Sequence, residues 1–285
     1  MAFSEQLSLR AVGIVGLGLI GGSMARAFQK YTTLRVYGCD TNPQTAMQAE
    51  RDGAVDAAGG PELLSRCGLV LVALYPQQTV TFVREQIERF APGSILVDLC
   101  GVKRYPVENL TSLCAEHGVT FIGGHPMAGK ETWGFSGSDA DLFQQASMIL
   151  TPDDHTPPDA LALASELFRQ IGFGRITLTT PEAHDRMIAF TSQLAHVVSS
   201  AYIKSPRALQ RSGFSAGSYK DLTRVAKLNP EMWTELFLEN GDDLVEEIDE
   251  IVLHLNEYRD AISQKDGTRL YTLLDDGRRI KEALQ

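Results

Sequence analysis

The sequence predicts an α/β protein in which a doubly wound parallel-sheet domain is followed by an all-α C-terminal domain. Up to about Thr180, short apolar runs rich in Val, Ile and Leu alternate with helical patterns. These runs are continuous rather than alternating, which is typical of parallel strands buried on both faces. Beyond Thr180 the apolar residues keep helical spacing instead. A length of 285 residues suits two medium domains, which we place at 1–180 and 181–285.

The expected strands of the first domain are short apolar segments. They lie at residues 11–15, 34–37, 69–74, 95–97, 120–122, 148–150 and 175–178. The helical patterns between them would cover both faces of the sheet.

The helical half begins at Thr180-Pro181, where an N-cap threonine and a proline at the first helical position open a helix. Its apolar residues at helical spacing are Ala183, Met187, Phe190, Leu194, Val197 and Ala201. A second helix starts near Asn229-Pro230 and keeps apolar residues on one side as far as Tyr258. Residues 230–262 present more apolar surface than one small domain can cover, so we expect a homodimer. A long helix packed within its own monomer is the alternative.

A glycine-rich turn follows the first expected strand and opens a helix. It consists of Gly16, Leu17, Gly18, Leu19, Ile20 and Gly21. This context predicts a Rossmann-type dinucleotide site, in which Gly16 permits the tight turn and Gly18 lets the backbone approach the pyrophosphate. Gly21 lets helix and strand pack closely, and the helix start at Leu19 and Ile20 offers N–H groups to phosphate. Taken alone, the motif could mark only a tight turn.

Asp40 ends the second expected strand, 19 residues after Gly21. A carboxylate there can accept hydrogen bonds from ribose hydroxyls and would repel a 2′-phosphate. The following Thr41-Asn42-Pro43 brings no arginine that could bind such a phosphate. We therefore expect NAD as the cofactor, with Asp40 also able to cap the turn that follows it.

His125 follows the expected strand at 120–122, directly after Gly123 and Gly124. In an open parallel sheet, ligands gather at the carboxyl ends of the strands. A histidine there can exchange a proton with a substrate hydroxyl while a hydride leaves the same carbon. The alternative is a histidine that satisfies a backbone group in a loop. The strand-end position and the flanking glycines favour catalysis.

Composition argues against several kinds of partner and site. The net charge is −10 and neither half of the chain has a basic excess, which argues against nucleic acid. No apolar run approaches the ~18 residues of a membrane helix. Glu5 lies where a signal peptide would be cationic, so we expect a cytoplasmic protein. The four cysteines lack CxxC spacing, which fits reduced thiols and no metal site.

Four separated motifs occur in one order behind the glycine turn. They are HPMAGKE at 125–131, SQLAH at 192–196, KDLTRVA at 220–226 and PEMW at 230–233. Together they resemble the prephenate dehydrogenase family, some of whose members use arogenate, and the resemblance spans nearly the whole chain. It implies an N-terminal dinucleotide-binding domain, a helical domain that dimerises, and an active site in the cleft between them.

The resemblance also implies roles for five residues. His125 corresponds to the catalytic histidine, which interacts with the substrate's 4-hydroxyl during hydride transfer to NAD. His196 corresponds to a second histidine that helps to hold the substrate, and Arg224 to an arginine that binds a substrate carboxylate. Glu131 corresponds to an acid that gates or organises the site, and Lys220 to a cation near the substrate.

The residues themselves leave alternatives at three positions. His196 could be a surface histidine. Arg224 could form a solvated ion pair with Asp221, three residues before it. Trp233, which matches an aromatic residue of the family, could be part of the core.

The chain departs from the family at Gly101. Many members have a serine there, which hydrogen-bonds the catalytic histidine and the 4-hydroxyl. Another donor, such as water, would have to serve in this chain.

The expected function is NAD-dependent oxidative decarboxylation of prephenate to 4-hydroxyphenylpyruvate, a step of tyrosine biosynthesis. Arogenate, which has an amino group in place of the side-chain keto group, is the alternative substrate and would give tyrosine directly. A β-hydroxyacid-type reductase and a non-catalytic NAD-binding sensor are the rival functions. Turnover of prephenate with NAD separates these functions.

Overall fold

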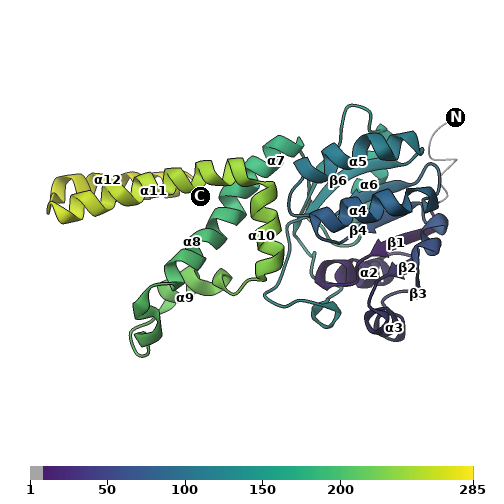
Figure 1. Cartoon of the computed structure of the whole chain (residues 1–285), viewed down its shortest axis with the longest axis horizontal. Coiled ribbons are helices and arrows are strands. Elements are labelled where there is room, and N and C mark those ends of the chain that lie inside the picture. Colours follow the sequence, from purple (N-terminus) through teal and green to yellow (C-terminus); the bar gives the residue numbers. More distant parts are fainter. Residues whose placement is uncertain (1–8, 285) are drawn as a thin grey trace.

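The computed structural model describes residues 9–284, so Glu5 lies outside the described residues. The N-terminal part is built on an eight-stranded sheet in the order β3-β2-β1-β4-β5-β6-β7-β8 (Figure 1). The strands are β1 (Ala11–Val15), β2 (Arg35–Cys39), β3 (Ala57–Gly59), β4 (Leu69–Val72), β5 (Ile95–Asp98), β6 (Thr120–Pro126), β7 (Ser147–Thr151) and β8 (Arg175–Leu178). Neighbouring strands are parallel except β6 and β7, which are antiparallel. The predicted doubly wound, mostly parallel sheet is confirmed.

The largest differences from the sequence prediction are at β3 and β6, and the bounds of other strands differ by one or two residues. β3 has no counterpart in the prediction because its residues are Ala, Ala and Gly, which form no strongly apolar run. β6 continues to Pro126, so His125 lies inside the last part of the strand instead of after it. The cause is the antiparallel pairing with β7, in which His125 lies opposite Ile149. His125 still lies near the carboxyl end of β6, as the argument for catalysis requires.

Helices cover both faces of the sheet (Figure 1), and an apolar core lies on each face. They are α2 (Leu19–Tyr31), α3 (Pro43–Arg51), α4 (Pro76–Gln86), α5 (Arg104–Glu116) and α6 (Pro158–Gln170). Residues of α2, α3 and α6 share one core with the sheet, and residues of α4 and α5 share the other. Burial on both faces accounts for the continuous apolar character of the strands.

The four cysteines lie in this first part of the chain, and all of them are buried free thiols. Burial raises the pKa of Cys39 to about 11 and the pKa of Cys67 and Cys114 to about 12. Burial also raises the pKa of Cys100. Thiols with such pKa values are protonated at neutral pH and react poorly as nucleophiles.

The C-terminal part is built of helices that extend away from the sheet (Figure 1). They are α7 (Pro181–Ile188), the π-helical turn η4 (Ala189–Gln193), α8 (Leu194–Ile203), the 3₁₀ turn η5 (Pro206–Gln210), α9 (Gly217–Thr223), the 3₁₀ turn η6 (Arg224–Ala226), α10 (Pro230–Glu239), α11 (Gly241–Ser263) and α12 (Gly267–Ala283). The hydroxyl of Thr180 accepts a hydrogen bond from the N–H of Ala183, so the predicted N-cap is confirmed. The division of the chain at residue 180 stays our proposed domain boundary.

The buried face of α7 differs from the predicted one. Met187 and Phe190 are 59% and 58% exposed, whereas His184, Asp185 and Ile188 are buried. The buried face packs on the start of α5, where free backbone N–H groups need acceptors. Apolar side chains cannot supply such acceptors, so polar residues occupy this face.

The long helix expected from Pro230 onward is two helices, α10 and α11, which meet at Asn240. The fully buried Asn240 side chain donates to the carbonyl of Asp185 and to the side chain of Gln193. It also accepts a hydrogen bond from Arg104. An asparagine with such partners, followed by glycine, favours a break in the helix.

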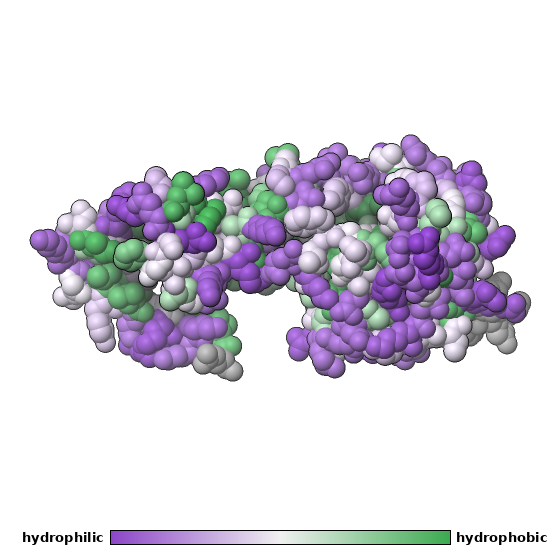
Figure 2. Space-filling view, turned by 90° about the horizontal axis from the view of Figure 1, so that it is seen from below, coloured by the Kyte–Doolittle hydropathy of each residue, from purple (hydrophilic) through white to green (hydrophobic). Residues whose placement is uncertain are grey.

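α11 and α12 lie side by side and project from the rest of the chain (Figure 1). Both carry large exposed apolar side chains, among them Leu255, Ile262, Tyr271 and Ile280. Apolar residues gather at this helical end of the molecule, on the left of Figure 2. None of the helices within residues 9–284 is long and apolar enough to cross a membrane.

Candidate active site

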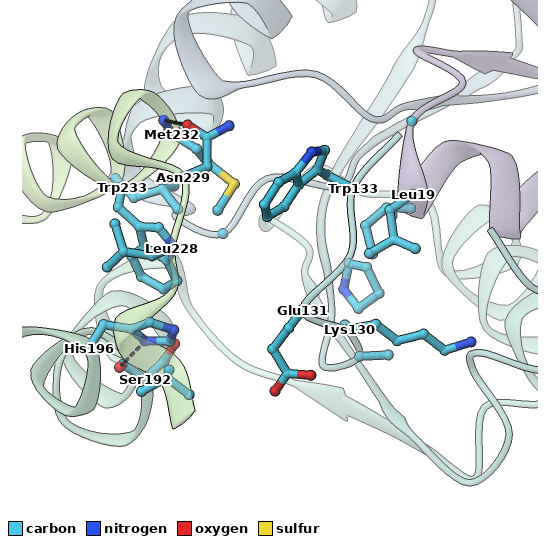
Figure 3. Close-up of a pocket in the computed structure, with 18 of the residues that line it drawn as sticks. Leu19, Lys130, Glu131, Trp133, Ser192, His196, Leu228, Asn229, Met232 and Trp233 are labelled. Carbon is cyan, nitrogen blue, oxygen red and sulfur yellow. Dashed lines mark hydrogen bonds between the residues drawn. The ribbon is translucent and has the colours of Figure 1, made fainter. Parts of the chain in front are cut away.

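A cavity of about 650 Å³ lies between the sheet and the helices that follow it. Its sheet side is formed by segments that follow β1, β4 and β5 and by the end of β6. Its helical side is formed by η4, α8, η6 and α10. Glu131 and Trp133 face His196 and Trp233 across this space (Figure 3). A ligand bound here would contact both parts of the chain.

The glycine turn has the geometry that the sequence motif requires. Gly16 has φ +81°, and a Cβ built there would lie 2.6 Å from the carbonyl oxygen of Ala73. A Cβ on Gly21 would lie 1.8 Å from the carbonyl oxygen of Gly16, so only glycine lets α2 pack this closely. A Cβ on Gly18 would have no described atom within 4 Å, and Gly18 lines the cavity. Gly16 and Gly21 therefore meet steric requirements of the turn and of the helix contact, and the approach of a pyrophosphate at Gly18 stays a prediction.

Asp40 ties the glycine turn to the end of β2. One carboxylate oxygen accepts a hydrogen bond from the N–H of Leu17 at 2.8 Å, and the other accepts one from the N–H of Asn42 at 2.8 Å. The carboxylate therefore caps the turn that follows it and also supports the glycine turn. Helix α3 has its own N-cap, the side chain of Asn42.

His125 lies in the cavity wall near the end of β6. Its Nδ1 is 2.9 Å from Nε2 of His184, and the two rings meet edge to face. Burial, reinforced by His184 and the nearby charge of Lys103, holds the pKa of His125 well below its usual 6.5. The imidazole is therefore neutral at pH 7 and has one nitrogen able to accept a proton.

The space beside the His125 ring explains how the chain accommodates Gly101. A Cβ built on Gly101 would lie 3.9 Å from Nε2 of His125, so a serine here would be close to the ring. The same Cβ would lie 3.3 Å from Cδ2 of Leu236, whose side chain comes from α10. An apolar side chain thus lies against the place where a side chain at position 101 would begin. The protein contact that orients the ring is made at Nδ1, by His184.

A buried ion pair joins the end of β5 to β6 beside the site. Nζ of Lys103 contacts the carboxylate of Asp98 and donates to the carbonyl oxygen of Gly124 at 2.6 Å. The same carboxylate accepts hydrogen bonds from the N–H groups of Cys100 and Gly124. Both charged side chains are fully buried, so neither could lose its partner without leaving a charge uncompensated in the interior. The residue before His125 is fixed by these contacts.

His196 lies in the opposite wall of the cavity, on α8. Its ring stacks on Trp233 with centroids 3.8 Å apart, and its Nδ1 donates to the carbonyl of Ser192 at 2.9 Å. Burial lowers the pKa of His196 against the opposing effect of the Ser192 hydrogen bond. His196 is half-buried, and its ring lines the cavity together with that of Trp233, which also packs against Phe237.

Arg224 and Glu131 meet across the cavity, with Nη1 2.5 Å from the carboxylate. The predicted alternative of an Arg224–Asp221 pair is therefore wrong. The hydrogen bond from Arg224 lowers the pKa of Glu131. Both side chains are more than half exposed, so the pair adds little to stability and can exchange partners easily. Lys220 is exposed on α9 and does not line the cavity.

His184 and Asp185 are site residues that the sequence prediction missed. Nδ1 of His184 is 2.7 Å from a carboxylate oxygen of Asp185, and both side chains are fully buried. Asp185 also accepts hydrogen bonds from the N–H groups of Lys103 and Arg104, at 2.7 and 2.9 Å. The sequence did contain a signal for them. A histidine and an aspartate are adjacent in the first two turns of the helix predicted to begin at Thr180-Pro181.

The chain matches two models of known domains. Residues 24–178 match the nucleotide-binding domain of prephenate dehydrogenase, and residues 180–276 match the dimerization domain of prephenate dehydrogenase. The chain belongs to the prephenate dehydrogenase family. The resemblance carried by the four sequence motifs is thereby confirmed.

Members of the prephenate dehydrogenase family similar to this chain differ in the substrate that they are named for. Cyclohexadienyl dehydrogenase of Zymomonas mobilis is 32% identical over 285 residues, covering 96% of each chain. The structure of A. aeolicus prephenate dehydrogenase with hydroxyphenyl propionate and NAD+ has a TM-score of 0.87 and 26% identity, covering 98% of this chain and 99% of that one. Synechocystis arogenate dehydrogenase has a TM-score of 0.81 and 28% identity, covering 96% and 100%.

Proposed function

We propose that the protein catalyses the NAD-dependent oxidative decarboxylation of prephenate to 4-hydroxyphenylpyruvate. The observation that carries the proposal is the position of His125, which shares one cavity with the glycine turn, His196 and Arg224. The reaction requires a base, a cofactor loop and groups that bind two carboxylates. These requirements fit the residues that line this cavity.

The residues around the glycine turn fit a bound dinucleotide. Gly18, Leu19 and Ile20 line the cavity at the start of α2, where free N–H groups favour phosphate. Asp40 lies next to this turn and would accept hydrogen bonds from the ribose hydroxyls. Its charge disfavours NADP, so NAD is the proposed cofactor. When bound, NAD supplies the hydride acceptor.

His125 provides the proton chemistry in this proposal. As hydride leaves C4 of prephenate, the C4 oxygen becomes acidic and gives its proton to the neutral ring of His125. The bond from C1 to its carboxylate then breaks, carbon dioxide leaves, and the electron pair makes the ring aromatic. The proton returns from His125 to the oxygen, giving the phenol of 4-hydroxyphenylpyruvate.

Arg224 and His196 bind the substrate at the opposite wall in this proposal. Arg224 exchanges its contact with Glu131 for a substrate carboxylate, which is why we assign Glu131 to organising the site. The stacked ring of His196 presents Nε2 for a further hydrogen bond. The role of Lys220 stays a prediction, because in this conformation it lies outside the cavity wall.

The first test is the assay of purified protein with prephenate and NAD. We expect NADH absorbance to rise as 4-hydroxyphenylpyruvate appears in equal amount. Comparable catalytic efficiency with NADP would contradict the role of Asp40. Tight NAD binding without turnover of prephenate or arogenate would support the sensor instead. Turnover of β-hydroxyacids alone would support the reductase.

Arogenate is the second candidate substrate. The similarity to Synechocystis arogenate dehydrogenase and to a cyclohexadienyl dehydrogenase favours it. The same base and the same hydride transfer would then give tyrosine. Chromatography of the products from each substrate, at equal enzyme and NAD, decides which of the two has the higher kcat/KM.

We further propose that the protein is a homodimer joined through its helical part. The match to the family's dimerization domain and the exposed apolar residues of α11 and α12 support this proposal. The cytoplasmic location expected from the sequence stays a prediction.

A further inference from the structure

A continuous chain of contacts leads from backbone N–H groups to the cavity. It begins at the N–H groups of Lys103 and Arg104, which donate to the carboxylate of Asp185. It continues through Asp185 to Nδ1 of His184 at 2.7 Å, and from Nε2 of His184 to Nδ1 of His125 at 2.9 Å. His184 and Asp185 lie behind the cavity wall, fully buried, and only His125 of the three lines the cavity.

The direction of each hydrogen bond follows from the first donors. Backbone N–H groups can only donate, so the Asp185 carboxylate accepts from both. Burial acts to raise the pKa of Asp185, but hydrogen bonds from His184 and the two N–H groups outweigh it and leave the pKa lowered. An ionised carboxylate can only accept, so Nδ1 of His184 carries a proton.

Only one nitrogen of His184 carries a proton. Burial lowers the pKa of His184 despite its contact with Asp185, so the ring is neutral at pH 7. With the proton on Nδ1, its Nε2 must accept, and Nδ1 of His125 must donate. A neutral His125 with its proton on Nδ1 has its lone pair on Nε2. The other charged groups near this pair of rings are themselves paired. Lys103 and Asp98 form a buried ion pair, and the Arg104 guanidinium contacts Asp185 at 3.4 Å and Asp243 at 2.8 Å.

We propose that His184, held by Asp185, is a positioning residue that fixes His125 as the Nδ1–H tautomer with Nε2 free to take the substrate proton. In this chain position 101 has no side chain that could contact the His125 ring, so the contact with His184 takes over the orienting role of the absent serine. When Nε2 takes a proton, the lone pair of His184 and the carboxylate of Asp185 stabilise the imidazolium of His125. The proposal rests on His125 acting as the base.

Two substitutions distinguish this role from simple packing. In His184→Ala no side chain accepts the hydrogen bond from Nδ1 of His125. We therefore expect kcat to fall, at most by the roughly 10² to 10⁴-fold that loss of a general base causes. KM and NAD affinity should change little. In His184→Gln an amide oxygen can still accept from Nδ1, so kcat should stay within about tenfold of the wild type. His155→Gln, at an exposed loop histidine, is the matched control and should leave kcat unchanged.

The decisive readout is the tautomer of His125, measured by ¹⁵N NMR of histidine-labelled protein at pH 7.5, with the signal assigned from the spectrum of His125→Asn. We expect the proton on Nδ1 in the wild type and in His184→Gln. A proton on Nε2 in the wild type, or wild-type kcat in His184→Ala, would overturn the proposal. If His184→Ala fails to fold, the tautomer in the spectra of the wild type and of His184→Gln still tests the proposal. Should neither prephenate nor arogenate be turned over, the proposed function fails, while the tautomer still tests the positioning.

Discussion

Replacing His125 with asparagine should separate chemistry from binding. The amide nitrogen of asparagine lies near the place of Nδ1, so it can still donate to Nε2 of His184 across the present 2.9 Å contact. Asparagine has no atom at the place of Nε2, which removes the proton acceptor and leaves the rest of the cavity wall intact. We expect kcat to fall by roughly 10² to 10⁴, the usual range for loss of a general base.

The assay is the steady-state rate of NADH formation with varied prephenate or arogenate, whichever the wild type prefers. KM and the affinity for NAD should stay near wild type, because the interactions with Arg224, His196 and the glycine turn are unchanged. His155→Asn at the exposed loop is the control. A large rise in KM with kcat unchanged would show that His125 binds the substrate and does not take its proton.

Three further predictions follow from the same geometry. Arg224→Ala should raise KM by about tenfold to 150-fold with kcat little changed, the effect of losing a hydrogen bond to a charged group; a pure kcat effect would contradict this. Burial lowers the pKa of His184 in the folded protein, so the folded state favours the neutral ring. The free energy of unfolding should therefore be highest above pH 6.5 and should decrease as the pH falls below 6.5. Urea unfolding between pH 8 and 5 should show stability falling by up to about 1.4 kcal/mol per pH unit for this residue, and His184→Gln should reduce the slope. Light scattering at micromolar concentration should give the mass of a dimer, and a monomer would refute the homodimer.

The sheet could be predicted from the sequence because its signals are local. Continuous apolar runs give the strands, and the glycine turn requires a positive φ at Gly16 and a close contact at Gly21, both of which the structure has. β3 and the extension of β6 to Pro126 depend on pairing with strands distant in sequence. No pattern within a short window of residues contains that information.

The site could be predicted only for residues that a motif marks. His125, His196, Arg224 and Glu131 belong to motifs, and the structure brings all four to one cavity. Whether Arg224 pairs with Asp221 or with Glu131 depends on how η6 meets the loop after β6. That arrangement is a property of the tertiary fold, so the nearer partner in sequence was the wrong choice.

Asp185 and His184 were missed because a helical pattern is judged by its apolar residues. The apolar spacing favours Met187 and Phe190 as the buried face of α7. In the structure the face that carries Asp185 is buried instead, because it packs on the start of α5. No side chain within the first turn of α5 caps that helix, so its free N–H groups require an acceptor from elsewhere, and Asp185 supplies it. Once Asp185 is fixed there, the residue before it is held against His125. The same hydrogen bonds that complete a helix end therefore also orient the proposed base, so a substitution at Asp185 should affect folding and catalysis together.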